Sequence, residues 1–430
     1  MLRYELYKPS GVEWLGEIPS HWEVVRAKRI FCEVSEKGHP NAELLSVTQD
    51  KGVIPRDQLD QRVVMPLGQL QTFKLVRTDD FVISLRSFQG GIEYSAYTGL
   101  VSPAYTVLRK QRDIHSGYLK YLLKSTGFIS ELNTSVKGIR QGKNIDFGEM
   151  SYSYLPIPAE DEQELIANFL DQKTAEIDTA IAKKQRLIEL LQEQKNILIN
   201  QAVTRSLNPD VPMRDSGVEW IGQIPAHWQT APLKHVSTVQ SGVTLGKSYA
   251  QVNSIKSYPY LRVANVQDGF LDLSDIAEIK LPIRHAKNYF LKKADILVTE
   301  GGDIDKLGRG ACWYGEIDEC LHQNHVFAIR IVRAVLPEFV SLITGVEYAR
   351  RYFTTTANKT TNLASTNKTK LGNLPLLVPP FDEQESILSH CEGINAQFKN
   401  LIGGVSNEIE SLKEMKSTLI ASVVTGKLKV

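Results

Sequence analysis

Residues 10–22 read SGVEWLGEIPSHW, and residues 216–228 read SGVEWIGQIPAHW. Ten of these thirteen positions are identical, and an eleventh is a Leu-to-Ile exchange. A repeat of this length indicates an internal duplication, so both halves of the chain are expected to carry the same scaffold. The tryptophans of both copies are predicted to anchor cores, with His21 and His227 as packing or hydrogen-bonding residues.

A second pair of matching segments lies further along each half. Asp161-Glu162-Gln163-Glu164 recurs as Asp382-Glu383-Gln384-Glu385, at an offset of 221. The same offset relates QEQKNILINQAVTRSL (192–207) to KEMKSTLIASVVTGKL (413–428). The duplication therefore extends over the whole chain.

The segment from Glu160 to Leu207 contains no Gly and no Pro, and its apolar residues recur at spacings of 3, 4 and 7. This pattern predicts a long helix with a coiled-coil-like seam, and the second copy keeps the pattern. A helix that long cannot bury its apolar stripe alone, and the other copy is the nearest matching partner. The predicted helix–helix interface consists of Ile177, Ile181, Ile188, Leu191, Leu198, Phe398, Ile402, Ile409, Leu412 and Leu419.

The remainder of each half has short β-branched and aromatic runs, such as 81–85, 104–108, 295–299 and 326–330, which predict strands. Helices are expected at 116–130 and 337–352. The sequence thus predicts an α+β fold with two similar mixed α/β domains, separated by two long antiparallel helices in pseudo-two-fold symmetry. The expected domains are a first head (1–158), a first long helix (159–207), a second head (208–379) and a second long helix (380–430).

Two similar heads on antiparallel helices would hold two binding surfaces at a fixed separation. DNA is a ligand for which such a separation matters, because half-sites present the same face about every 10 base pairs, or about 34 Å. The arrangement therefore favours recognition of a two-part DNA target.

A basic stretch without acidic residues precedes each long helix. The first is at 132–145, and the second, which is longer, is at 348–372. Lys and Arg neutralise phosphates, and Arg, Asn and Gln discriminate bases, so these stretches are candidate DNA-reading loops. A solvated loop without a ligand is the alternative. Arg86 and Arg309, in other predicted loops, are further candidates for DNA contact. The remaining candidates are Lys137, Arg140, Gln141, Lys143, Asn144, Lys359, Thr361, Asn362, Lys368 and Lys370.

The composition of the 430 residues is that of a globular protein, with 42% hydrophobic and 23% charged residues. Lys and Arg number 50 and Asp and Glu 49, a net charge of +1, which excludes a general polycation. The four cysteines show no metal-ligand spacing, so no metal site is expected. No signal peptide and no apolar run of membrane-spanning length is found, which predicts a cytoplasmic protein.

Motifs for catalysis are incomplete. The segment 242–248 (GVTLGKS) has three residues where a phosphate-binding loop needs four between its glycines. The segment 378–381 (VPPF) lacks the polar first residue of the amino-methyltransferase motif, and no glycine-rich cofactor loop follows a predicted strand. We therefore predict no catalytic residues and no cofactor bound by this chain.

Two copies of W.G.IP.HW, each opening a variable domain, and two copies of DEQE at the start of a long helix resemble the specificity (S) subunit of type I restriction–modification systems. The resemblance covers the whole chain. It implies that each variable domain is a target recognition domain for one half of a bipartite DNA sequence, and that the paired helices set the spacer. It further implies docking of two modification subunits, which use S-adenosylmethionine, and of restriction subunits, which use ATP and Mg²⁺.

Two other functions remain open at this point. A scaffold protein could bridge DNA with twin heads that have no base specificity. A fused methyltransferase is the second alternative, and binding of S-adenosylmethionine by the isolated chain would distinguish it.

Overall fold

The computed structural model describes residues 2–59, 70–134, 136–137, 144–244, 246, 254–333, 335–360 and 363–430. The chain forms two compact units. Unit 1 contains Met1–Arg186 and Val405–Val430, and unit 2 contains Leu187–Gly404. Both boundaries fall inside a long helix, so the division by packing differs from the division by chain order, and the chain-order domains stay a prediction.

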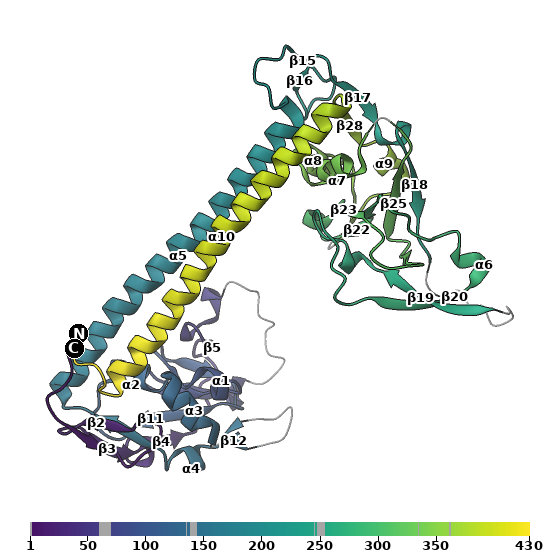
Figure 1. Cartoon of the computed structure of the whole chain (residues 1–430). Coiled ribbons are helices and arrows are strands. Elements are labelled where there is room, and N and C mark those ends of the chain that lie inside the picture. The colour runs from purple at the N-terminus through teal and green to yellow at the C-terminus, as the bar shows by residue number, and fades with distance from the viewer. Residues whose placement is uncertain are drawn as a thin grey trace. The chain divides into compact units, whose positions relative to one another are not determined.

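Unit 1 mixes short strands with helices (Figure 1). Its strands are β1 (Tyr7–Pro9), β2 (Glu17–Pro19), β3 (Glu23–Arg26), β4 (Phe31–Val34), β5 (Leu45–Thr48), β6 (Gly52–Pro55), β7 (Lys74–Val76), β8 (Phe81–Ile83), β9 (Glu93–Tyr94), β10 (Gly99–Val101), β11 (Thr106–Lys110), β12 (Val136–Lys137), β13 (Asn144–Ile145) and β14 (Tyr154–Ile157). Its helices are α1 (Ser87–Gly90), α2 (Ser116–Leu122), α3 (Thr126–Thr134), α4 (Phe147–Met150), the first part of α5 (Glu160–Arg205) and the last part of α10 (Phe381–Val424).

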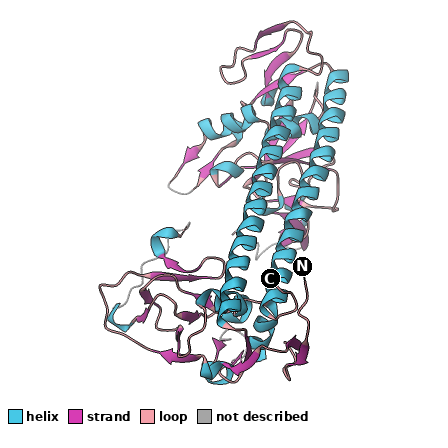
Figure 2. Ribbon diagram, turned by 90° about the vertical axis from the view of Figure 1, so that its left-hand side faces the viewer, coloured by secondary structure: helices cyan, strands magenta, loops and turns pink. Residues whose placement is uncertain are grey.

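Unit 2 has the same mixture of elements, with strands in magenta and helices in cyan in Figure 2. Its strands are β15 (Met213–Asp215), β16 (Gln223–Pro225), β17 (Gln229–Pro232), β18 (Ser237–Ser241), β19 (Ile255–Leu261), β20 (Ala277–Pro282), β21 (Asp295–Thr299), β22 (Gly301–Gly302), β23 (Gly310–Trp313), β24 (Leu321–His322), β25 (Val326–Ile331), β26 (Asn358–Lys359), β27 (Ala364–Ser365) and β28 (Pro375–Val378). Its helices are the last part of α5, α6 (Ile283–Ala286), α7 (Pro337–Gly345), α8 (Glu347–Thr356), α9 (Lys368–Gly372) and the first part of α10 (Phe381–Val424).

A four-stranded antiparallel sheet lies at the centre of each unit. The strand order is β4-β11-β8-β9 in unit 1 and β18-β25-β21-β23 in unit 2. The central strands β8 and β21 are buried along their whole length, which suits their β-branched and aromatic residues. Strands predicted at 81–85, 104–108, 295–299 and 326–330 are confirmed as β8, β11, β21 and β25.

The prediction of one helix at 116–130 and one at 337–352 is wrong, because each is a pair of helices. In unit 1 the hydroxyl of Ser125 donates to the carbonyl of Leu122, which ends α2, and accepts from the backbone N–H of Phe128 in α3. In unit 2, Val346 is extended (φ −79°, ψ 160°) and separates α7 from α8. Side-chain hydrogen bonds to the nearby backbone, such as those of Ser125, compete with helix continuation.

The repeated DEQE segment begins each long helix, α5 of 46 residues and α10 of 44 residues. Acidic residues in the first turn favour a helix start because the helix dipole is positive there. The Gln of each copy is buried and bonds to backbone on both sides. Gln163 bonds to His115 N and Pro158 O, and Gln384 bonds to Leu336 N and Pro379 O.

Within unit 1 the two long helices run antiparallel. Asp178 of α5 forms an ion pair of 2.6 Å with Lys416 of α10, and Lys184 pairs with Glu408. The residue number therefore rises along α5 as it falls along α10. Three of the predicted interface residues are buried: Ile177, Phe398 and Ile409. The others are half-buried: Ile181, Ile188, Leu191, Leu198, Ile402, Leu412 and Leu419.

Each core includes an end of both helices. In unit 2, Ala202 and Val203 of α5 pack with Ile387 and Cys391 of α10. In unit 1, Val424 at the end of α10 packs into the core that contains the buried Trp22.

The two chain termini also meet within unit 1, where the N–H of Lys429 donates to the carbonyl of Leu2 (2.9 Å). Within the part of the chain that the structure describes, no helix is long and apolar enough to cross a membrane.

Candidate nucleic-acid interface

Corresponding ion pairs fix which positions of the two central sheets are equivalent. Arg109 donates two hydrogen bonds to Asp80 (2.8 and 2.9 Å), and Arg330 donates two to Asp295 (2.6 and 2.7 Å). Both aspartates are almost fully buried, and two bonds from one guanidinium are a strong and geometrically defined contact. In both cases the aspartate lies at the beginning of the central strand and the arginine on its neighbour. The two pairs therefore superimpose one sheet on the other.

In unit 1 a polar hairpin lies between α3 and α4. Its strands β12 and β13 pair antiparallel, with Lys137 opposite Asn144. The short helix α1 packs against β13, and the exposed Arg86 immediately precedes α1. The structure thus brings three predicted DNA-binding residues to one region of unit 1. The other three, Arg140, Gln141 and Lys143, lie outside the described residues.

The hairpin at the same place in unit 2, between α8 and α9, is formed by β26 and β27 and is joined by β22. Lys359 on β26 and Lys368 at the start of α9 are exposed. Lys370 is half-buried and donates to Asn358 Oδ1 (2.6 Å) on the hairpin. Thr361 and Asn362 lie outside the described residues.

Arg309 is half-buried and lies between Gly308 and β23. Its Nη1 donates to Gln267 Oε1 (3.2 Å), and its Nε has no hydrogen-bond partner among the residues that the structure describes. Part of its donor capacity is therefore used within the protein, in contrast to the exposed Lys359.

Sequence reasoning missed a polar cluster next to the unit 2 hairpin. Glu300 follows β21, and Asn324 and His325 form the turn that leads into β25. His325 Nδ1 lies 2.6 Å from Glu300 Oε2, and Asn324 Nδ2 lies 3.4 Å from His325 Nε2. Glu300 accepts through its carbonyl from the N–H of Thr366 (2.8 Å), directly after β27. No sequence motif marks this cluster, because it combines residues 24 positions apart that only the strand register brings together.

Each repeated His-Trp pair binds the glutamate of the adjacent DEQE segment. In unit 1, His21 Nε2 (2.9 Å) and Trp22 Nε1 (3.0 Å) bond to Glu162. In unit 2, His227 and Trp228 make the same bonds to Glu383. The prediction that these histidines are packing or hydrogen-bonding residues is confirmed.

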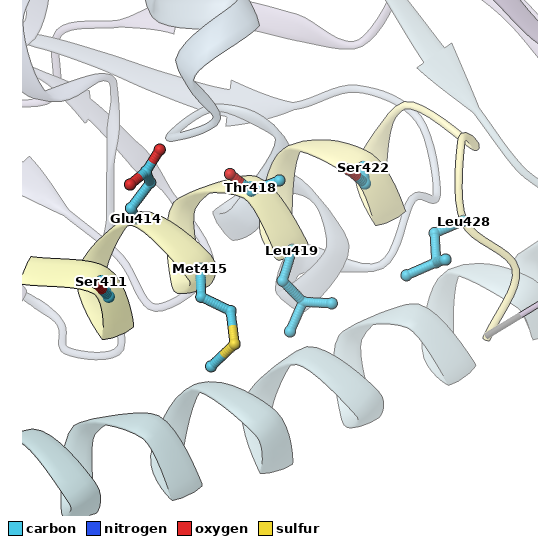
Figure 3. Close-up of a pocket in the computed structure, with 7 residues that line it drawn as sticks. All are labelled: Ser411, Glu414, Met415, Thr418, Leu419, Ser422 and Leu428. Atoms are coloured by element: carbon cyan, nitrogen blue, oxygen red, sulfur yellow. The ribbon is translucent and has the colours of Figure 1, made fainter. Parts of the chain in front are cut away.

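The last turns of α10 line a pocket of about 480 Å³ on unit 1 (Figure 3). Met415, Leu419 and Leu428 give it an apolar wall, and Glu414 and hydroxyl groups surround them. Among the described residues, no group of three or more His, Cys, Asp or Glu side chains could hold a metal ion.

The fold and these surfaces define an internally duplicated α+β protein, whose two units carry unlike polar hairpins at the same place on matching sheets. Comparison with known proteins shows which proteins the chain is similar to. The chain is 23% identical over 328 residues to the EcoKI specificity subunit of Escherichia coli K12, covering 75% of this chain and 68% of that protein. It is 20% identical over 437 residues to the StySPI specificity subunit of Salmonella potsdam, covering 96% and 90%.

The fold has a solved counterpart in a structure of the assembly of a type I restriction–modification system. One chain of that structure matches with a TM-score of 0.66 and 16% identity, over 96% of this chain and 99% of that chain. A scan against family models gave no match. The chain is thus a relative of the type I restriction enzyme specificity subunits, which confirms the resemblance seen in the sequence.

Proposed function

We propose that this chain is the non-catalytic DNA-specificity subunit of a type I restriction–modification enzyme, and that each unit reads one half of a bipartite target. The observation that carries the proposal is the combination of equivalent sheets with unlike polar hairpins. Equivalent scaffolds place two surfaces in the same way, while unlike side chains read different base edges. Relatedness to named specificity subunits supports the same function.

In this proposal the target recognition domains are residues 1–158 and 208–379, and the helical segments 159–207 and 380–430 form an antiparallel coiled coil with pseudo-two-fold symmetry. The coiled coil sets the length of the unread spacer between the half-sites. The burial of Ile177, Phe398 and Ile409 supports this pairing, as does the Asp178–Lys416 ion pair.

We further propose that two modification subunits dock on the long helices. Exposed apolar side chains on both long helices support this, because exposed apolar surface marks interaction sites. They are Leu187, Leu190, Ile197, Leu401 and Met415. S-adenosylmethionine, ATP and Mg²⁺ would belong to the modification and restriction subunits, with none bound by this chain, and the complex would act in the cytoplasm.

The recognition function is tested by purifying this chain with its modification subunits and selecting bound duplexes from a random DNA library. We expect one bipartite motif with a fixed spacer, preferred over scrambled DNA by about 1,000-fold or more. Binding without base preference would instead identify a DNA-bridging scaffold. S-adenosylmethionine binding by the isolated chain would indicate a fused methyltransferase.

The docking surface is tested with Met415→Glu, which places a charge on the apolar wall shown in Figure 3. We expect less modification subunit to co-purify with the variant. Asn400→Glu is the matched control, because Asn400 is exposed on α10 and does not line this pocket. Equal recovery with both variants would remove this surface from the proposal.

A further inference from the structure

The positions that follow the matched strands differ between the units in a chemically specific way. Val82 pairs with Val107 in unit 1, and Leu297 pairs with Ala328 in unit 2. With Asp80 equivalent to Asp295 and Arg109 to Arg330, these two strand pairings have the same register. Sequence positions beyond the end of each strand can be compared between the units by the same count.

That count places three unlike pairs at one end of the two sheets. Glu300 corresponds to Leu85, Asn324 to Pro103, and His325 to Ala104. Unit 2 thus has three polar side chains where unit 1 has a leucine that is 52% exposed, a proline and an alanine. A proline and an alanine side chain cannot form hydrogen bonds, so the difference changes what each unit can recognise.

Hydrogen bonds hold the unit 2 turn in place. The N–H of Asn324 donates to the carbonyl of Val243 (3.0 Å), and the Nδ1 of the buried His322 donates to the carbonyl of Val326 (2.6 Å). Burial lowers the pKa of His322. The turn that carries Asn324 is therefore fixed at both ends.

The side-chain amide of Asn324 lies next to the His325 ring. A carboxylate only accepts hydrogen bonds, so the Nδ1 of His325 donates to Glu300. The Nδ2 of Asn324 lies 3.4 Å from the Nε2 of the same ring. An asparagine amide carries N–H donors beside an oxygen acceptor. The His325 side chain is 56% exposed, so the cluster lies at the surface.

We propose that Asn324 reads an adenine in the half-site of unit 2, with His325 and Glu300 as positioning residues; this inference rests on the proposed DNA-specificity function. An amide N–H beside an amide oxygen matches the N7 acceptor and the N6 donor of adenine in the major groove. The backbone bond from Thr366 to Glu300 places this cluster beside the hairpin of β26 and β27. The cluster and the hairpin form one surface for the same half-site.

The test uses the complex with modification subunits and selection from random duplexes. Wild-type complex is expected to select adenine at one position of one half-site, by at least about fivefold over other bases. Asn324→Ala removes that preference. Asn324→Asp moves it toward cytosine, because a carboxylate accepts from cytosine N4 but cannot donate to adenine N7. Unchanged selection at the remaining positions of the same half-site reports that unit 2 is folded in each variant.

The positioning role has its own pair of variants. Glu300→Ala frees the His325 ring and weakens the adenine preference, whereas Glu300→Gln keeps an acceptor for Nδ1 and retains it. The control for Asn324→Asp is Asn208→Asp, which adds the same negative charge to another turn of unit 2. This control preserves the acceptor for the N–H of Asp210 (3.0 Å). We expect no change in base preference with this control.

The outcomes separate the inference from the function on which it rests. If the wild-type complex shows no base preference at all, the proposed function fails. If it selects a bipartite motif, and the Asn324 variants select that motif with unchanged preference at every position, Asn324 is not a reader and the inference is overturned.

Discussion

The carboxylates of Glu162 and Glu383 each connect a repeated His-Trp pair to the beginning of a long helix. Trp22 and Trp228 are buried, and an indole N–H buried without an acceptor costs about 1–3 kcal/mol. A glutamate in the first turn supplies that acceptor and also interacts favourably with the helix dipole. In unit 1 the His-Trp pair and the helix start thus depend on each other for their hydrogen bonds, although Trp22 and Glu162 are 140 residues apart in the sequence.

Glu162→Ala is expected to lower the free energy of unfolding by about 1–3 kcal/mol, because it leaves the Trp22 indole N–H buried without a partner. Chemical denaturation of the purified chain measures this change. The matched control is Glu164→Ala, an exposed glutamate of the same DEQE segment, which should shift stability by no more than about 0.5 kcal/mol. Equal effects of the two substitutions would contradict the role of Glu162.

Acid is expected to destabilise unit 2 through Glu383. Burial alone would raise the pKa of this carboxyl, but hydrogen bonds from His227 and Trp228 outweigh it and hold the pKa below its usual value of 4.5. A carboxyl with a lowered pKa stabilises the fold above its unfolded pKa, and this contribution is lost as the pH falls through the folded pKa.

Glu383→Gln should therefore unfold at a lower temperature than wild type at neutral pH, and the gap should narrow as the pH falls below about 4.5. Thermal unfolding followed at a series of pH values measures the gap. A gap that stays constant down to about pH 3 would show that the ionised carboxylate contributes nothing.

At the candidate interface, Lys359→Ala is expected to weaken DNA binding, by about 1–3 kcal/mol if the side chain contacts a base. A phosphate contact would instead weaken binding to all sequences alike and reduce its salt dependence. Arg140→Ala is the corresponding substitution in unit 1. Lys293→Ala is the control, since Lys293 is exposed and precedes β21, whereas the hairpin meets the residues that follow β21. Unchanged affinity and target choice with Lys359→Ala would remove this residue from the interface.

Sequence reasoning reaches the site only in part. The basic stretches were visible because charge and polarity can be read along the chain, and the structure brings Arg86 to the hairpin of Lys137 and Asn144. The cluster of Glu300 and His325 could not be found in this way. Its members are joined by the pairing of β21 with β25, and that register is set by burial and by the Asp295–Arg330 pair.

At the scale of elements, the long helices were the most predictable part of the fold. Periodicity over more than forty residues outweighs any local preference, and α5 begins at Glu160, where the pattern begins. The short helices were less predictable. Whether α7 and α8 are one helix or two depends on the backbone of Val346, which tertiary packing decides.

The interior of helix α10 contains two adjacent glycines, Gly403 and Gly404, which lower the stability of the helix. Glycine in a helix interior costs about 1 kcal/mol relative to alanine. Added methyl groups would meet no atom within 4 Å at either position, so nothing in the packing requires glycine there.

Gly403→Ala and Gly404→Ala are therefore each expected to stabilise the protein, by about 0.5–1 kcal/mol, with a higher temperature of thermal unfolding. The control is Gly426→Ala. Gly426 has a φ of +72°, and an added Cβ would lie 2.3 Å from Pro19 Cδ, so this substitution should destabilise. Destabilisation by Gly404→Ala would show that α10 needs local flexibility at this point.

At the scale of the molecule, the duplication explains why the core of each unit contains side chains from both long helices. Each unit's core takes the last turns of one long helix and buries side chains from the first turns of the other. A single head with its own helix would leave part of its core uncovered. Two copies in one chain supply each other with the missing segment, and the two heads can then diverge at their hairpins without loss of the shared scaffold.

If the helices set the spacer, their length should determine the distance between half-sites. Four residues inserted within 177–198 of α5, with four more at 403–406 of α10 to preserve the antiparallel register, lengthen the pair by about 6 Å at 1.5 Å per residue. At about 3.4 Å per base pair this corresponds to a spacer longer by about two base pairs. Selection from random duplexes should return the same two half-sites with a longer spacer. Altered half-sites, or an unaltered spacer in a variant that still binds selectively, would show that something other than helix length fixes the separation.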